Sequence, residues 1–247
     1  METWRAWELV LGDLERRHDV LAPTLPGHAG GPPLGSLVSE DAILDQLEVI
    51  MDAADMPAAD IAGNSLGGYL ALKLAARGRA RSVVAFAPAG GWREDDGSRE
   101  RLLNEQRALH ETMRSLAPRA GEMLATAAGR RRATALIAEH YEHIPAELLA
   151  HQMLAIALCE AEPMIDFAIG AGYSLDPELV TCPVRIVWGM EDRLLPWPSA
   201  AVRFREWLPR ADWVQLDGAG HCPQLDVPLE AAQLILGFAA GSATITA

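Results

Sequence analysis

The segment Gly63-Asn64-Ser65-Leu66-Gly67-Gly68 contains the residue types and spacing best suited to chemistry. It matches the pattern G-x-S-x-G, in which the serine lies on a sharp turn between a strand and a helix. Such a turn exposes the Ser65 hydroxyl and directs the unpaired N–H groups of a helix N-terminus towards it. Glycine is expected on both sides of the serine because a Cβ would clash across the turn. The pattern therefore predicts a nucleophilic serine.

Two later segments supply an acid and a histidine. Residues 187–192 read Val-Trp-Gly-Met-Glu-Asp, so that Asp192 follows the end of a short apolar run. Residues 217–223 read Asp-Gly-Ala-Gly-His-Cys-Pro and place His221 in a glycine-rich loop. Glu191 and Asp217 are alternative acids close to the same positions. The chain thus carries a serine, an acid and a histidine in this order, each beside a predicted strand.

Short apolar segments alternate with helical patterns around these motifs. The predicted strands are 19–23, 59–62, 82–86, 184–188 and 213–216, and the predicted helices are 2–17, 39–54, 65–76, 199–208 and 229–240. This alternation favours an α/β fold, with a mostly parallel sheet covered by helices on both faces. From about residue 93 the strand signals vanish and helical patterns replace them. We therefore expect a core in two parts, 1–92 and 176–247, separated by an inserted helical cap at 93–175.

The order of the motifs resembles that of the α/β-hydrolase superfamily, in its branch of small capped esterases and carbon–carbon hydrolases. The resemblance extends over nearly the whole chain, and the loop Leu25-Pro26-Gly27-His28 is similar to one of the family's loops. It implies that Ser65 is the nucleophile, that His221 takes its proton, and that Asp192 holds the imidazole. The backbone N–H of Leu66 would be one oxyanion donor. The resemblance implies no metal and no organic cofactor.

The beginning of the chain departs from the family pattern. In the family, the third strand and the loop that supplies the second oxyanion N–H come before the position that corresponds to Met1. We expect both to be missing, and we hypothesise that the true start lies upstream. Loss of one oxyanion donor typically lowers a rate by about 10²–10³-fold.

The resemblance predicts a serine hydrolase that cleaves a small ester or related acyl substrate through an acyl-enzyme intermediate. Carbon–carbon hydrolysis and perhydrolysis use the same triad and stay open. A serine in the turn argues against haloalkane dehalogenases and epoxide hydrolases, which resemble this family but use aspartate there. The alternative is a non-catalytic or crippled scaffold that binds a small ligand, because the second oxyanion donor is missing.

Other polar and aromatic residues have two readings each. The candidates for substrate binding are Asn64, Trp92, Tyr141 and Trp197, and packing in the core or cap explains the three aromatic residues equally well. We expect His28 to order its loop, the alternative being that it faces the substrate pocket.

Three further positions are better explained without a functional role. We expect Cys222 to be a buried thiol and Asp226 to cap the helix that follows it. His140 and His143 are three residues apart, and we expect both on an exposed helix face, because no third ligand is spaced to complete a metal site.

Composition restricts the remaining possibilities. The 247 residues fit one medium domain, and 50% hydrophobic with 22% charged residues exclude a disordered chain. The 21 Lys and Arg against 34 Asp and Glu give a net charge of −13, which argues against nucleic-acid or membrane-surface partners. The first residues do not have the pattern of a secretory signal, and the three cysteines have no metal-ligand spacing. We expect a cytoplasmic protein with a small-molecule partner.

Overall fold

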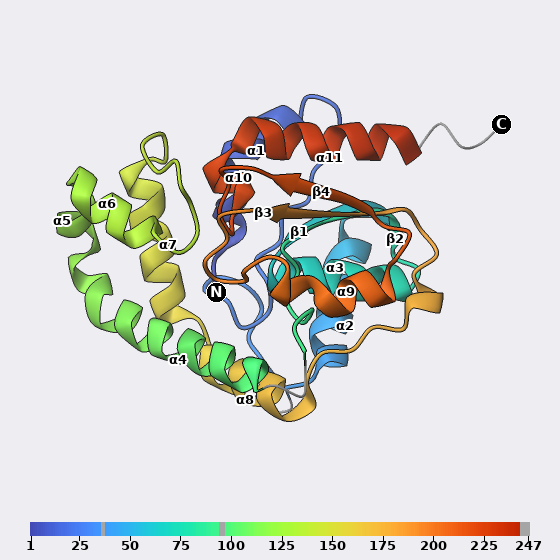
Figure 1. Ribbon diagram of the computed structural model, residues 1–247, viewed down its shortest axis with the longest axis horizontal. Helices are drawn as coiled ribbons and strands as arrows, with labels where there is room; N and C mark the ends of the chain where they lie inside the picture. Colours follow the sequence, from blue (N-terminus) through green and yellow to red (C-terminus); the bar gives the residue numbers. More distant parts are fainter. Residues whose placement is uncertain (36–37, 94–96, 243–247) are drawn as a thin grey trace.

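A parallel sheet forms the centre of the structure, a computed structural model that describes residues 1–35, 38–93 and 97–242 (Figure 1). Its strands, in spatial order, are β1 (Ala59–Asn64), β2 (Ala80–Phe86), β3 (Val184–Gly189) and β4 (Asp212–Leu216). Every neighbouring pair is parallel. Parallel strands end at the same edge of a sheet, so the segments that follow β1, β3 and β4 meet at one edge.

Helices cover both faces of this sheet. One face packs on α2 (Glu40–Ala53), α3 (Leu66–Ala76) and α9 (Val202–Trp207), and the other on α1 (Glu8–Leu14) and α11 (Pro228–Ser242) (Figure 1). Strand β2 shows the alternation that this arrangement needs. Val83 and Ala85 belong to the first core cluster, whereas Val84 and Phe86 belong to the second. The predicted α/β class is confirmed.

Most predicted elements form close to their expected bounds, with two differences near the N-terminus. The helix predicted at 2–17 is a short 3-10 helix, η1 (Trp4–Trp7), followed by α1. The strand predicted at 19–23 was wrong, although all five residues are described. Its Val20 packs on the cluster beneath α1 and α11, but the segment joins no ladder of the sheet. An apolar run becomes a strand only when a neighbour pairs with its backbone.

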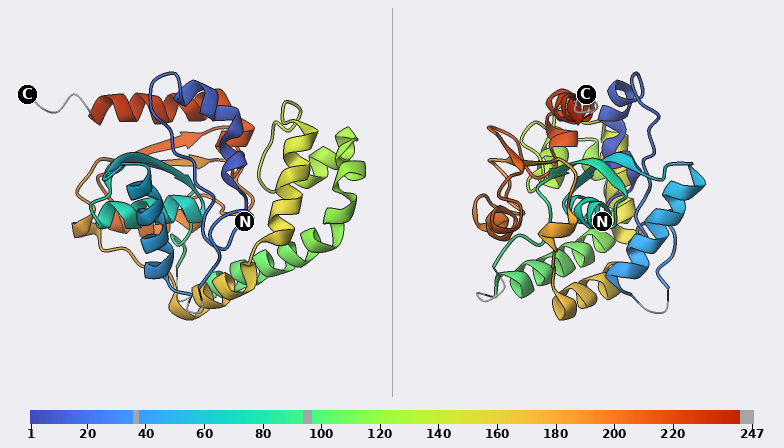
Figure 2. Two further views of the ribbon diagram at one scale, coloured as in Figure 1. Left: turned by 180° about the vertical axis from the view of Figure 1, so that it is seen from behind. Right: turned by 90° about the vertical axis from the view of Figure 1, so that its right-hand side faces the viewer.

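The segment between β2 and β3 contains a group of helices that lies to one side of the sheet (Figures 1 and 2). They are α4 (Ser98–Leu116), η2 (Ala117–Arg119), α5 (Ala120–Leu124), α6 (Ala127–Thr134), α7 (Ala146–Leu158) and α8 (Ala161–Ala171). We call α4 to α8 the helical cap. The C-terminal ends of β3 and β4 point towards it. Residues 94–96, at the beginning of the predicted cap, lie outside the described residues.

Shorter helices complete the connections, namely η3 (Pro177–Leu179), η4 (Ser199–Ala201) and α10 (Pro223–Asp226). Within the described ranges, every helix is too short or too polar to cross a membrane.

The first residues of the chain lie between the cap and the sheet, where Figure 1 marks the N-terminus. The Thr3 hydroxyl lies 2.9 Å from Nε2 of His151 on α7, and the Thr3 N–H lies 3.5 Å from Oε1 of Gln152. Met1 packs on an apolar cluster that includes Leu103 of α4 and Cys159. This segment therefore contacts the cap directly.

Candidate active site

Ser65 occupies the turn between β1 and α3. Its backbone has φ 55° and ψ −119°, a conformation that serine rarely adopts and that costs of the order of 1–3 kcal/mol. The turn is held by the end of β2, because the Ser65 N–H donates to the Phe86 carbonyl at 2.9 Å and the Ala89 N–H donates to the Ser65 carbonyl at 3.0 Å. Ser65 stays partly exposed. Leu66 is the first residue of α3, so its N–H lies among those that the helix leaves unpaired.

The two glycines of the motif have different reasons to be glycine. A Cβ on Gly63 would lie 2.2 Å from the Gly67 carbonyl oxygen, so the turn closes only without a side chain there. A Cβ on Gly67 would meet no described neighbour within 4 Å. The expected clash is therefore confirmed at Gly63 and was wrong at Gly67, where the side-chain direction is open.

His221 and Asp192 are in direct contact, and both are buried. Nδ1 of His221 lies 2.7 Å from Oδ2 of Asp192. The other carboxylate oxygen, Oδ1, accepts the N–H groups of Leu194 at 2.9 Å and Leu195 at 2.7 Å. These contacts leave Nε2 as the ring nitrogen available for another partner.

The alternative acids are not placed in this way, because Glu191 and Asp217 are both exposed. The loops after β3 and β4 also touch. A Cβ on Gly189 would lie 2.2 Å from the Gly220 carbonyl oxygen, so glycine at this position lets the acid loop and the histidine loop approach each other. Of the three acids considered, the structure brings only Asp192 to His221.

Asn64 joins the serine turn to the histidine loop. Its Nδ2 donates to the Phe86 carbonyl at 3.1 Å and to the His221 carbonyl at 2.8 Å. Its Oδ1 accepts from Cys222 Sγ at 3.4 Å and from Gln224 Nε2 at 3.2 Å. The sequence suggested Asn64 as a substrate-binding residue. In the structure, both polar atoms of its side chain bind other parts of the protein.

The three aromatic candidates lie in different environments. Trp92 is buried in the core and contacts the ring of Tyr173, with 5.2 Å between centroids. Trp197 lies between Trp188 and Trp213, at 5.9 and 5.8 Å. Packing accounts for both tryptophans. Tyr141 lines a surface hollow of about 440 Å³ beside Arg193, the residue that follows Asp192.

Burial shifts the pKa values of three side chains, those of Glu2, Cys222 and His28. Burial raises the pKa of the Glu2 carboxyl, and the charges of the N-terminal amine and His221 act in the opposite direction. Burial likewise raises the pKa of the Cys222 thiol well above its usual range. Burial lowers the pKa of His28 to about 3, and its Nδ1 lies 3.2 Å from the Pro26 carbonyl. The expectations of a buried Cys222 and of a His28 that orders its own loop are confirmed. Nothing in the sequence indicated that Glu2 interacts electrostatically with His221.

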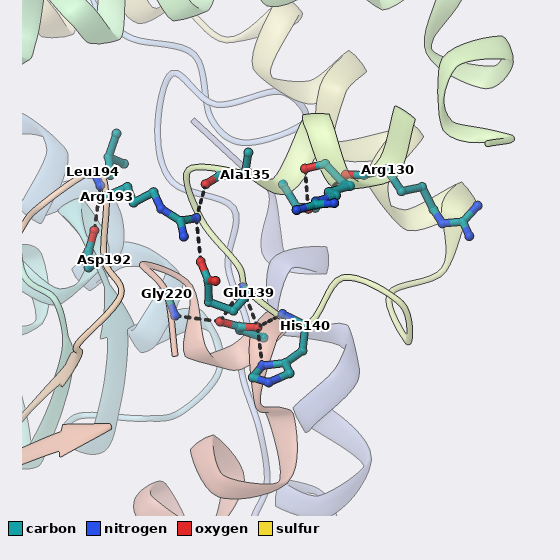
Figure 3. Close-up of polar contacts among 11 residues, drawn as sticks. Arg130, Ala135, Glu139, His140, Asp192, Arg193, Leu194 and Gly220 are labelled. Carbon is teal, nitrogen blue, oxygen red and sulfur yellow. Dashed lines mark hydrogen bonds and ion pairs between the residues drawn. The ribbon is translucent and has the colours of Figure 1, made fainter. Parts of the chain in front are cut away.

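Two expectations were wrong, one about the histidines between α6 and α7 and one about Asp226 at the end of α10. His140 and His143 are exposed, as expected, but they lie in an irregular segment and a turn rather than on a helix. Their rings contact Asp226 Oδ1 at 3.2 Å and the Leu225 carbonyl at 2.8 Å. Asp226 does not cap the helix that follows it. Instead its buried carboxylate accepts the N–H groups of Glu139, His140 and Gly220, which Figure 3 shows converging from two segments.

Comparisons with known proteins agree with this fold. The chain is 28% identical over 220 residues to the epoxide hydrolase EphH of Mycobacterium tuberculosis, a match that covers 81% of the chain and 95% of that protein. It is 34% identical over 90 residues to a 2-hydroxymuconate semialdehyde hydrolase of a Pseudomonas species, covering 35% and 32% of the two chains.

Solved structures show the same fold at low identity. A meta-cleavage product hydrolase of Pseudomonas fluorescens superposes with a TM-score of 0.70 at 22% identity, covering 98% of this chain and 87% of that one. A thermophilic esterase of Thermogutta terrifontis gives 0.69 at 19% identity, covering 98% and 86%. The family model described as "Alpha/beta hydrolase family" matches residues 2–234. The chain therefore belongs to the alpha/beta hydrolase family.

Proposed function

We propose that this hydrolase cleaves a small ester or related acyl substrate with Ser65 as the nucleophile. The Ser65 oxygen attacks the carbonyl carbon while His221 Nε2 takes the hydroxyl proton. The proton then passes to the leaving alcohol, and an acyl-enzyme remains. Water attacks the acyl carbon while His221 takes its proton, and His221 then gives this proton to the leaving Ser65 oxygen as the acid is released. The N–H of Leu66 stabilises the negative oxygen of each tetrahedral intermediate.

The observation that carries this proposal is the contact between His221 Nδ1 and Asp192 Oδ2 at 2.7 Å. A carboxylate on Nδ1 fixes the imidazole tautomer in which Nε2 is the acceptor, as a base acting on a serine requires. Asn64 supports the proposal further. It precedes Ser65 in the chain and binds the His221 carbonyl, and so limits how far the nucleophile and the base can separate.

The chemistry of serine favours acyl substrates over epoxides, although one relative is named an epoxide hydrolase. Attack of a serine oxygen on an epoxide carbon would leave an ether, which has no carbonyl to which water can add. Attack on an acyl carbon leaves an ester, which a water molecule activated by His221 can hydrolyse. Ser65 at the turn is therefore suited to turnover only with a carbonyl substrate.

A fluorophosphonate probe and a panel of p-nitrophenyl esters of increasing acyl length test the proposal. We expect the native protein to be labelled on Ser65 and to hydrolyse the short esters, and Ser65→Ala to lose both activities. The matched control is Ser115→Ala on the exposed surface of α4, where the hydroxyl donates to the Thr112 carbonyl. The proposal is refuted if the folded wild type is neither labelled nor active.

Carbon–carbon hydrolysis is the second candidate, because the local match at 34% identity is to a 2-hydroxymuconate semialdehyde hydrolase. It requires the same attack on a carbonyl carbon, with a carbanion equivalent rather than an alcohol as the leaving group. Turnover of a vinylogous diketone with little turnover of esters would favour carbon–carbon hydrolysis.

A scaffold that only binds a ligand predicts a different result. The protein would then hydrolyse neither substrate, and Ser65→Ala would leave its affinity for the ligand unchanged.

A further inference from the structure

Asp226 is a buried carboxylate that the proposed reaction does not use. It is the last residue of α10 and lies five positions after His221, and its side chain has no exposed surface. Its Oδ1 accepts the N–H groups of Glu139 at 2.9 Å and His140 at 2.6 Å. Its Oδ2 accepts the N–H of Gly220 at 2.6 Å and shares that of Glu139 at 2.9 Å. Burial of a charge is tolerable only with such donors.

The donors come from two segments that are far apart in the sequence. Gly220 immediately precedes His221, whereas Glu139 and His140 belong to the cap, between α6 and α7 (Figure 3). One carboxylate is thus the common acceptor for the histidine loop and for a cap segment about 80 residues away. If the carboxylate is lost, N–H groups on both segments lose their acceptor together.

Backbone contacts bring the same two segments close. The Cys222 N–H donates to the Ile137 carbonyl at 2.9 Å, so the histidine loop is bound to the cap directly on one side of His221 and through Asp226 on the other. A Cβ on Gly220 would lie 2.8 Å from the Ile137 carbonyl oxygen, which leaves little room for displacement.

The cap segment also reaches the acid loop. Arg193, which follows Asp192, forms an ion pair with Glu139 at 2.6 Å and donates to the Ala135 carbonyl at 2.8 Å (Figure 3). Residues 135–140 therefore touch the loops that carry both members of the His221–Asp192 pair.

We infer that Asp226 is a positioning residue that couples the seating of cap residues 135–140 to the placement of the His221 imidazole. The inference rests on the proposed role of His221 as the base. Asp226 contacts no reacting atom and acts through Gly220 and the backbone of residues 139–140. With the carboxylate in place, the cap segment and the histidine loop form one rigid unit. Without it, the loop that carries His221 loses one of its two links to the cap.

Asp226→Asn tests this coupling with almost no change in side-chain volume. An amide offers one acceptor oxygen, so its NH₂ group must face an N–H of either the cap segment or Gly220. We expect kcat per probe-labelled site to fall by about 10²-fold, the typical effect of a misplacement near 1 Å, with little change in KM. Asp212→Asn is the matched control, because it removes a half-exposed carboxylate that pairs with Arg185 far from His221.

A spectroscopic readout separates positioning from a merely structural role. The proton between His221 Nδ1 and Asp192 Oδ2 is expected to give a far-downfield ¹H NMR resonance in the wild type. Asp226→Asn should shift or broaden this resonance, and Asp212→Asn should leave it in place. A residue that only stabilises the fold would lower Tm without moving the resonance. A folded Asp226→Asn variant with wild-type kcat and an unmoved resonance would overturn the inference.

Two further outcomes keep the test decisive. If Asp226→Asn does not fold, Gly220→Ala replaces it, because this variant displaces the histidine loop from Ile137 while keeping Asp226. We expect it to lower kcat and to shift or broaden the resonance. Unchanged kcat and an unchanged resonance in that variant would refute the coupling. If the wild type neither reacts with the probe nor hydrolyses esters, the proposed function fails. The resonance comparison still decides whether Asp226 positions His221, because it needs no turnover.

Discussion

The side-chain amide of Asn64 donates to the backbone carbonyl of His221 at 2.8 Å, across 157 positions of sequence. This bond connects the residue before Ser65 to the backbone of the proposed base. The same side chain also binds the end of β2 and the two residues Cys222 and Gln224. Asn64 therefore holds together the strand end, the serine turn and the histidine loop.

Asn64→Ala should lower both stability and turnover. The substitution removes the donor to the His221 carbonyl, and an unsatisfied buried polar group typically costs about 1–3 kcal/mol. We expect the free energy of unfolding in urea to fall by that amount, and kcat to fall because His221 is less well placed. Asn104→Ala on the exposed surface of α4 is the control and should change neither. Wild-type kcat in Asn64→Ala would refute the positioning role.

The glycines of the serine turn should respond differently to alanine. Gly63→Ala places a Cβ 2.2 Å from the Gly67 carbonyl oxygen and should cost at least about 2–3 kcal/mol. Gly67→Ala points into open space within α3 and should stabilise the protein by up to about 1 kcal/mol, since alanine has the higher helix propensity. Thermal unfolding of the two variants measures the difference. Equal losses of stability would contradict the geometry.

The local features of the fold could be predicted from the sequence because short-range signals specify them. The helix predicted at 39–54, for example, forms as α2, and the Ser39 hydroxyl accepts the Ala42 N–H at 3.1 Å at its start. Likewise, the apolar runs around Val83 and Ile186 predicted β2 and β3. Each of these elements carries its own pattern of apolar residues or its own capping group.

Features that depend on distant partners could not be predicted in this way. Residues 19–23 are mostly apolar and end at Pro23, but whether they form a strand depends on a neighbour that sequence periodicity does not reveal. Asp226 was expected to cap the next helix because its position permits it, whereas two of the three residues whose N–H groups it accepts lie 86 and 87 positions away. The role of Asn64 was missed for the same reason. Its main contacts lie on a loop more than 150 positions later.

Acid should destabilise the protein partly through His28. Burial lowers the pKa of His28 to about 3 in the folded state, while the unfolded chain keeps a value near 6.5. Below about pH 6.5, His28 therefore binds a proton in the unfolded state but not in the folded state. The free energy of unfolding falls as the pH decreases towards 3. From pH 7 to pH 4.5 we expect a loss of about 2–3 kcal/mol from this group.

His28→Gln should remove that contribution, because glutamine does not titrate in this range. Urea unfolding of both proteins at pH 7 and pH 4.5 measures it. The wild type should lose more stability than the variant over this interval. If both proteins lose the same amount, His28 is not buried in its neutral form.

The cysteines should react with iodoacetamide in the order of their exposure. Cys182 is half-buried beside a hollow of about 640 Å³, whereas Cys159 and Cys222 are buried. Burial raises the pKa of Cys222 well above its usual range, so its thiolate is scarce at pH 8. We expect Cys182 to be alkylated first, with ester turnover unaffected, and Cys182→Ser to resist this early modification. Early labelling of Cys222, with loss of turnover in parallel, would contradict the expected order of reactivity.

The acid of the proposed triad can be identified by comparing neighbouring carboxylates. Asp192→Asn keeps the size of the side chain but replaces an acceptor by a donor, so the His221 imidazole is held in the wrong tautomer and its cation is not stabilised. In a serine triad this change typically lowers kcat by about 10⁴-fold. Glu191→Gln, at the adjacent exposed position, and Asp217→Asn, on the exposed part of the histidine loop, should leave kcat near the wild-type value. Steady-state ester hydrolysis by the three folded variants provides the measurement. A large loss in Glu191→Gln or Asp217→Asn, with activity retained in Asp192→Asn, would show that the buried contact at 2.7 Å is structural and that another acid supports His221.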